Sequence, residues 1–114
     1  MPVTRDQVRL SADDQEAIRR ATARACREAG VVWRRIILFG SRTDPRRRGG
    51  DIDLLLEIEA APPVDGYRLK QRLQLALEDD LGPQRFDLVV DDGTAAGGFA
   101  DLARTRGVEL WSNS

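Results

Sequence analysis

The sequence predicts a small α/β (α+β) domain, in which a mixed sheet of about four strands has helices packed mainly on one face. The first observation is the order of the hydrophobic patterns, which alternate as helix, strand, strand, helix, strand, helix, strand. The second is the length, because 114 residues suit a single domain, 1–114, with one modest core. The third is the composition, 41% hydrophobic and 32% charged, which is typical of a globular chain.

Three stretches carry apolar residues at helical spacing. In the first stretch Ser11 can cap the N-terminus and Gly30 provides a stop. The second has the longest leucine-rich stripe and ends at Gly82-Pro83, and the third is short and closes at Gly107. The predicted helices are residues 11–29, 64–81 and 99–106.

Four short runs are rich in branched and aromatic residues, as strands are. A helical turn is expected between the first two, after Gly40-Ser41 and before Pro45. The predicted strands are residues 31–39, 51–58, 85–90 and 108–111.

Acidic residues gather on one face of the second and third predicted strands. Asp51 and Asp53 share a face with Leu55 and Glu57, because alternate strand residues point to the same side. Asp87 has the same alternation on the third strand. If the two strands are neighbours, three carboxylates converge as ligands for two Mg²⁺ ions about 3.5–4 Å apart, an arrangement used for in-line phosphoryl displacement. We assign the role of proton acceptor to Asp87, the acid furthest along the sequence from the Gly-Ser turn.

The Gly-Ser turn supplies candidate phosphate contacts. Gly40 lets the backbone approach a phosphate closely, and the Ser41 hydroxyl can donate a hydrogen bond to a phosphate oxygen. Arg42 can offset triphosphate charge. The arginine run at 46–48 is equally consistent with a phosphate clamp and with a solvated loop.

Each part of this pattern also has an ordinary explanation. A Gly-Ser pair is a common turn, Asp-x-Asp a common strand entry, and Asp87 alone could be a surface acid; their combination in this strand context favours a metal and nucleotide site. Asp91 and Asp92 are predicted to form a turn rather than to bind metal. Trp33 and Trp111 are predicted to pack in the core or at a sheet edge.

Several absences narrow the function further. The chain has no histidine, which excludes Ser-His-Asp and Cys-His catalysis and His-ligated zinc, and it has no P-loop ending in Gly-Lys-Ser/Thr. A net charge of −1 argues against direct nucleic-acid binding, and no apolar run is long enough to span a membrane. Residues 1–10 show no secretory signal and Cys26 is the one cysteine, so a reducing cytoplasm is expected.

Taken together, these residues resemble the minimal nucleotidyltransferases of the DNA polymerase beta superfamily. The resemblance rests on Gly40-Ser41, a loop at 42–50, Asp51-x-Asp53, and Asp87 on a later strand. It implies the nucleotidyltransferase (polymerase beta-like) fold and Mg²⁺-dependent transfer of a nucleoside monophosphate to a hydroxyl, with release of pyrophosphate. On this basis the metal-binding and catalytic residues are Asp51, Asp53 and Asp87, and the nucleotide-binding residues are Gly40, Ser41 and Arg42.

The size of the chain refines the resemblance. Larger members add a domain that holds the acceptor, whereas this chain is similar to the MNT antitoxins that pair with a HEPN-domain RNase toxin. The resemblance therefore implies an enzyme that uses ATP and two Mg²⁺ ions to transfer AMP to a hydroxyl of a HEPN toxin. Because it contains no histidine, the chain does not fit the HEPN partner itself.

Two other functions remain open at the level of the sequence. One is an antitoxin that neutralises its partner by binding alone, with the leucine-rich helix 64–81 or the end carrying Trp111 as its surface. The other is a small-molecule nucleotidyltransferase whose acceptor pocket forms between subunits. The sequence leaves the acceptor, the preferred nucleotide and the oligomeric state undetermined.

Overall fold

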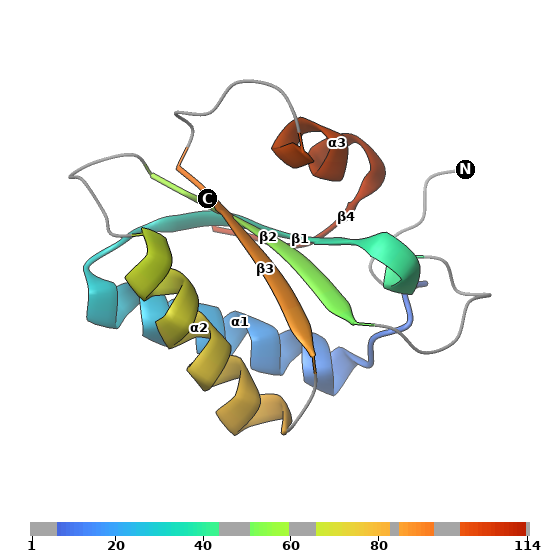
Figure 1. Ribbon diagram of the computed structural model, residues 1–114. Coiled ribbons are helices and arrows are strands. Elements are labelled where there is room, and N and C mark those ends of the chain that lie inside the picture. Colours follow the sequence, from blue (N-terminus) through green and yellow to red (C-terminus); the bar gives the residue numbers. More distant parts are fainter. Residues whose placement is uncertain (1–6, 44–50, 60–65, 83–84, 93–98, 114) are drawn as a thin grey trace.

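A computed structural model describes residues 7–43, 51–59, 66–82, 85–92 and 99–113 of the chain (Figure 1). Its element order is the one that the sequence predicts, including the helical turn after the first strand, which is a 3₁₀ helix, η1. The elements are α1 (Ala12–Ala29), β1 (Trp33–Phe39), η1 (Gly40–Thr43), β2 (Ile52–Ile58), α2 (Gly66–Leu81), β3 (Phe86–Asp91), α3 (Phe99–Arg106) and β4 (Val108–Ser112).

The strands form one mixed sheet in the order β3-β2-β1-β4. Strand β1 is antiparallel to both β2 and β4, whereas β2 and β3 run parallel. Helices α1 and α2 cover one face of the sheet, and the shorter α3 lies on the other (Figure 1). The predicted fold class, a small α+β domain with helices mainly on one face of a four-stranded sheet, is thus confirmed.

Two hydrophobic clusters reflect the alternation of residues in the strands. The larger cluster joins α1 and α2 to one face of the sheet, and in β2 it includes Ile52, Leu54, Leu56 and Ile58. The smaller cluster lies under α3 and contains Leu55 of β2. Burial on one face therefore leaves the polar positions of β2 and β3 on the face that α3 covers only in part.

The ends of α1 are fixed by the residues that the sequence suggests. The Ser11 hydroxyl accepts a hydrogen bond from the Asp14 backbone N–H at 3.0 Å, which satisfies one of the free donors of the first turn. At the other end Gly30 adopts φ 70°, the left-handed conformation that commonly closes a helix. The predicted start of the second helix, residues 64 and 65, lies outside the described residues.

Both tryptophans pack as predicted, in the core or at a sheet edge. Trp33 is buried, and Trp111 is partly buried against the larger cluster. The Trp111 indole N–H donates to the Gln15 backbone oxygen at 2.9 Å, and the Arg19 guanidinium lies 5.6 Å from its ring centre. In α2, Leu69, Leu73 and Leu77 are likewise buried in the core.

Candidate active site

The register of the sheet brings two of the three candidate ligands together. Strands β2 and β3 pair in parallel with Asp53 opposite Asp87. Directly paired residues project from the same face, here the one turned away from α1 and α2. Asp51 lies just before β2 and is exposed. The expectation that the second and third strands are neighbours is confirmed by this pairing.

Gly40 lies against the Asp53 side chain. Phe39 at the end of β1 pairs with Asp53, so the next residue begins η1 beside that carboxylate. A Cβ added at Gly40 would lie 3.0 Å from the Asp53 Cγ and would collide with its Oδ2. Gly40 also has φ 78°, which residues with a side chain rarely adopt. Both its conformation and its surroundings therefore require glycine.

The turn after β1 is helical, as predicted, and is closed by its own residues. The Thr43 hydroxyl donates to the Gly40 carbonyl at 2.7 Å. The backbones of Ser41 and Arg42 lie in this turn, but their side chains fall outside the described residues. The arginine run at 46–48 lies wholly outside them. The phosphate contacts assigned to Ser41 and Arg42 therefore stay predictions.

The three carboxylates influence one another electrostatically. Burial raises the pKa of Asp53 above its ordinary value, and the charges of Asp87 and Asp51 raise it further. Among the residues that the structure describes, no arginine or lysine forms an ion pair with any of the three. Asp53 is thus an ionisable group that a cation from solution would stabilise in its charged form.

The donor chemistry of this group fits a hard divalent cation. In the described parts of the chain, no three His, Cys, Asp or Glu side chains are already drawn together as a metal-binding group. Mg²⁺ does not need such a cage, because it keeps several waters and commonly takes one or two carboxylates plus substrate phosphates. Asp53 and Asp87, with Asp51 beside them, offer oxygen ligands of this kind on an open face.

A second pair of acids lies further along the same two strands, and the sequence analysis missed it. Glu57 of β2 pairs with Asp91 of β3 in the same register and on the same face. The predicted role of Asp91 as a turn residue is wrong, because β3 extends through Asp91 and buries it. The repeat of the acid pair after four residues on both strands is the signal that could have revealed it.

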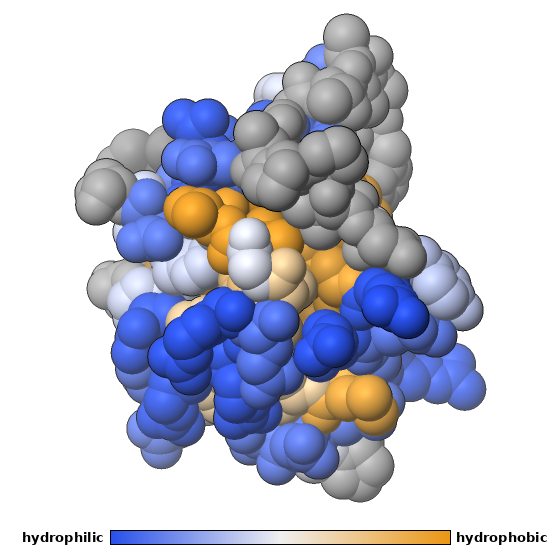
Figure 2. Space-filling model, turned by 90° about the vertical axis from the view of Figure 1, so that its left-hand side faces the viewer, coloured by the Kyte–Doolittle hydropathy of each residue, from blue (hydrophilic) through white to orange (hydrophobic). Residues whose placement is uncertain are grey.

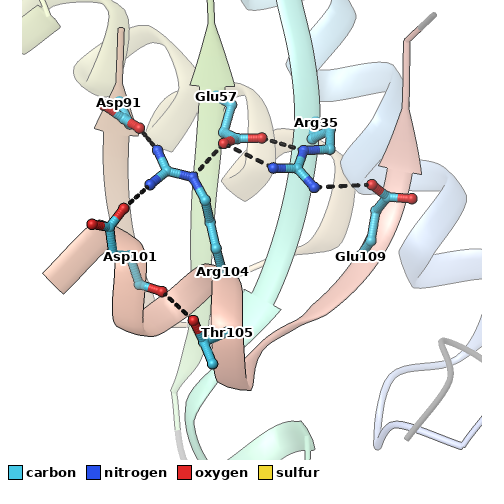
Figure 3. A network of polar contacts seen from close by, with 7 residues as sticks. All are labelled: Arg35, Glu57, Asp91, Asp101, Arg104, Thr105 and Glu109. Atoms are coloured by element: carbon cyan, nitrogen blue, oxygen red, sulfur yellow. Dashed lines mark hydrogen bonds and ion pairs between the residues drawn. The ribbon is translucent and has the colours of Figure 1, made fainter. Parts of the chain in front are cut away.

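Two arginines neutralise this second pair, as Figure 3 shows. Arg104 of α3 reaches across the strands: its Nε lies 2.5 Å from Glu57 Oε2, and its Nη2 contacts Asp91 Oδ2. Arg35 of β1 also pairs with Glu57, with Nη2 3.1 Å from Oε2. Burial alone would raise the pKa of Glu57, but the hydrogen bonds from both arginines outweigh it, and the pKa lies below its ordinary value.

No protein-family model matches the chain, and a search of curated proteins finds no match either. The described residues contain no helix with both the length and the apolar character needed to cross a membrane.

Proposed function

We propose that this chain is a Mg²⁺-dependent nucleotidyltransferase of the minimal type, which transfers AMP from ATP to a hydroxyl of a protein partner. The observation that carries the proposal is the Asp53–Asp87 pair, held side by side on parallel strands and next to the Gly40 turn. Unlike the acid pair four residues further on, it has no basic partner among the described residues. An acid pair arranged in this way favours a cation bound together with a substrate.

The reaction assigns a separate task to each part of the site. The acceptor hydroxyl oxygen attacks the α-phosphorus of ATP, an O–P bond forms, and the bond to the bridging oxygen of pyrophosphate breaks. Asp87, the more exposed of the paired acids, takes the hydroxyl proton. Asp51, Asp53 and Asp87 would hold the metal, and the turn at Gly40, which leaves no room for a side chain beside Asp53, would take the triphosphate. When bound, Mg²⁺ would offset triphosphate charge and lower the pKa of the attacking hydroxyl.

The proposed acceptor is a HEPN-type RNase toxin, and silencing it would make the chain an antitoxin. This step is supported by the resemblance to MNT antitoxins that the Gly40-Ser41 turn, Asp51-x-Asp53 and Asp87 carry. One cysteine, buried and with its pKa raised to about 11 by burial, is consistent with work in a reducing cytoplasm.

The test is transfer of labelled AMP from ATP with Mg²⁺ to the co-purified partner. We compare the wild type with an Asp51→Asn/Asp53→Asn variant. A Glu59→Gln/Asp79→Asn variant removes the same charge at two exposed positions outside the site and serves as the matched control.

The proposal requires that the partner is labelled by the wild type and the control but not by the site variant. Label that persists in the site variant would contradict the assigned residues. An intact, inhibited complex that carries no label in any sample would contradict catalysis and support neutralisation by binding alone.

A further inference from the structure

An arginine to which the sequence analysis assigns no role lies at the start of β3, beside the candidate acids. The Arg85 backbone oxygen accepts a hydrogen bond from the Ile52 backbone N–H at 2.9 Å. The parallel pairing of β2 with β3 begins at Ile52 and Phe86. Asp51 and Arg85 each precede that first pair by one residue, so they lie level at the same end of the sheet.

The alternation of the strand directs Arg85 to the face that carries the acids. Residues two apart on a strand project to the same side, so Arg85 shares a face with Asp87. Asp87 in turn pairs with Asp53 on that face. Arg85 is exposed, as are Asp51 and Asp87. A cation therefore lies on the open surface around the candidate site, on the opposite side of β2 from the Gly40 turn.

Arg85 does not neutralise the acids that it accompanies. Among the residues that the structure describes, its guanidinium forms no ion pair. Burial raises the pKa of Asp53, and the two neighbouring acids raise it further, but Arg85 does not act against them. Arg104, by contrast, contacts both acids of the other pair. The charge of Arg85 is thus available to a substrate.

We propose that Arg85 binds the α-phosphate of ATP, the group at which transfer takes place. This inference rests on the proposed function, which supplies the nucleotide. Asp87 is the proposed proton acceptor, so the acceptor hydroxyl and the phosphorus that it attacks lie near Asp87 on β3. Residues two apart on a strand are separated by about 6.6 Å, a distance that the long arginine side chain can span.

The guanidinium suits a phosphate by charge and by shape. Its planar fork of N–H donors can bind two phosphate oxygens at once. Two Mg²⁺ ions offset the three carboxylates but leave most of the triphosphate charge to the protein. An arginine that contacts the transferred phosphoryl group stabilises the transition state, so we expect Arg85 to support the rate as well as the binding.

Arg42 and Arg85 would approach the nucleotide from opposite sides. The Arg42 backbone lies in η1 after β1, whereas Arg85 precedes β3, and β2 separates these two strands in the sheet. The turn with Arg42 is predicted to take the triphosphate. In this arrangement the β- and γ-phosphates belong to the turn and the α-phosphate to Arg85.

The first test measures Mg²⁺-dependent binding of α,β-methylene-ATP by titration calorimetry. This analogue cannot undergo transfer, so no acceptor is needed. We compare the wild type with Arg85→Met, which removes the charge and keeps a long side chain. Arg85→Lys keeps the charge and loses the planar fork.

Arg27→Met provides the matched control. Arg27 is exposed in the last turn of α1, on the side of the sheet opposite to that of Asp53 and Asp87. In the side view of Figure 2, the lower half, where the helical layer lies, is a mainly hydrophilic surface with separate hydrophobic patches. An arginine of this layer is one solvated charge among many. Its removal changes the net charge as Arg85→Met does and leaves the candidate site intact.

We expect Arg85→Met to weaken binding of the analogue by at least ~10-fold, Arg85→Lys to weaken it less, and Arg27→Met to leave it unchanged. Equal affinities of the wild type and Arg85→Met would overturn the role of Arg85 and leave the proposed function intact. A wild type that does not bind the analogue in Mg²⁺ would contradict the proposed function itself, and the inference with it.

The second test distinguishes the α-phosphate from the other two. Transfer of labelled AMP to the co-purified partner is measured at saturating ATP, where weaker binding no longer limits the rate. We expect the rate of Arg85→Met to fall by ~100-fold or more and that of Arg27→Met to match the wild type. An unchanged rate of Arg85→Met at saturation would assign the contact to the β- or γ-phosphate and overturn the proposal.

A third measurement separates substrate binding from charge compensation. If Arg85 offset the charges of Asp53 and Asp87, its removal would destabilise the metal-free protein and tighten Mg²⁺ binding. We expect neither, so urea unfolding in EDTA and the Mg²⁺ affinity without nucleotide should be the same for Arg85→Met and Arg27→Met. A less stable Arg85→Met variant that binds Mg²⁺ more tightly would overturn the proposal and make Arg85 a counter-ion of the acids.

Discussion

Two pairs of acids occupy the same face of the same two strands, and they differ in what surrounds them. Glu57 and Asp91 are opposite one another in β2 and β3, as are Asp53 and Asp87 four residues earlier. The Glu57–Asp91 pair is tied to Arg104, with Arg35 adding a second cation at Glu57. The Asp53–Asp87 pair has no ion-pair partner among the described residues.

The contrast is one of charge compensation within the described residues. Adjacent buried carboxylates repel, so one of them must take up a proton or a cation must approach. The protein provides that cation itself at Glu57 and Asp91, where the two guanidinium groups lower the pKa of Glu57. At Asp53 the pKa is raised instead, as expected for a site that receives its cation from solution.

The largest effect should follow from removing one acid of each pair and measuring transfer of labelled AMP with Mg²⁺. Asp87→Asn removes the proposed proton acceptor, and we expect the rate to fall by ~10³-fold or more. Glu57→Gln removes an acid of the arginine-bound pair, and its rate should change by less than ~10-fold. Similar losses in both variants would show that the two pairs do not have separate roles.

Arg104→Met should have the largest effect on stability, because it leaves the buried Asp91 next to the half-buried Glu57 without their shared cation. We expect the free energy of unfolding in urea to fall by about 3 kcal/mol. A Glu57→Gln/Asp91→Asn/Arg104→Met variant removes the stranded charges and should recover most of this loss. If the triple variant is no more stable than Arg104→Met, charge compensation is not what the arginine provides.

The sequence was sufficient to predict the fold class because periodicity is a local signal. The alternation Ile52, Leu54, Leu56, Ile58 defines the core face of β2, and Ser11 and Gly30 define the ends of α1. The pairing of Asp53 with Asp87 followed once the second and third strands were placed side by side.

The arginine network could not be predicted in this way, because it depends on contacts between distant segments. Arg104 lies 47 positions from Glu57, and nothing in its local sequence shows that α3 places it over β2 and β3. Asp91 precedes Asp92 and Gly93, a pattern that indicates a turn. Hydrogen bonding between β3 and β2 extends through Asp91, which overrides the local preference for a turn and buries the Asp91 carboxylate.

A smaller loss of stability and of transfer should come from Gly40→Ala, which tests the close contact between the turn and the Asp53 carboxylate. The added methyl group would displace the Asp53 carboxylate and would also hold a non-glycine residue at φ 78°. We expect unfolding to become easier by about 1–2 kcal/mol and Mg²⁺-dependent transfer to fall. Gly30→Ala provides the control, since it has φ 70° and no atom within 4 Å of an added Cβ. A Gly30→Ala variant that loses transfer as strongly would assign the effect to backbone strain rather than to the Asp53 contact.

The smallest expected effect is on the pH dependence of the free energy of unfolding, where Asp53 and Glu57 should act in opposite directions. Without metal, the raised pKa of Asp53 means that the folded state binds a proton more tightly than the unfolded state. The free energy of unfolding should therefore decrease as pH rises from the ordinary carboxyl pKa through the raised folded value. Glu57 has the opposite sign: its lowered pKa gives stability that is present above the unfolded pKa and lost as pH falls through the folded value.

Asp53→Asn should therefore stabilise the metal-free protein slightly at pH 7, because water screens much of the effect, whereas Glu57→Gln should destabilise it. Urea unfolding in EDTA and in Mg²⁺ measures both effects. Added Mg²⁺ should stabilise the wild type, because it binds the folded state, and should act much less on Asp53→Asn. An Asp53→Asn variant that is less stable than the wild type in EDTA would mean that Asp53, like Glu57, is already compensated within the protein, and the distinction between the two acid pairs would fail.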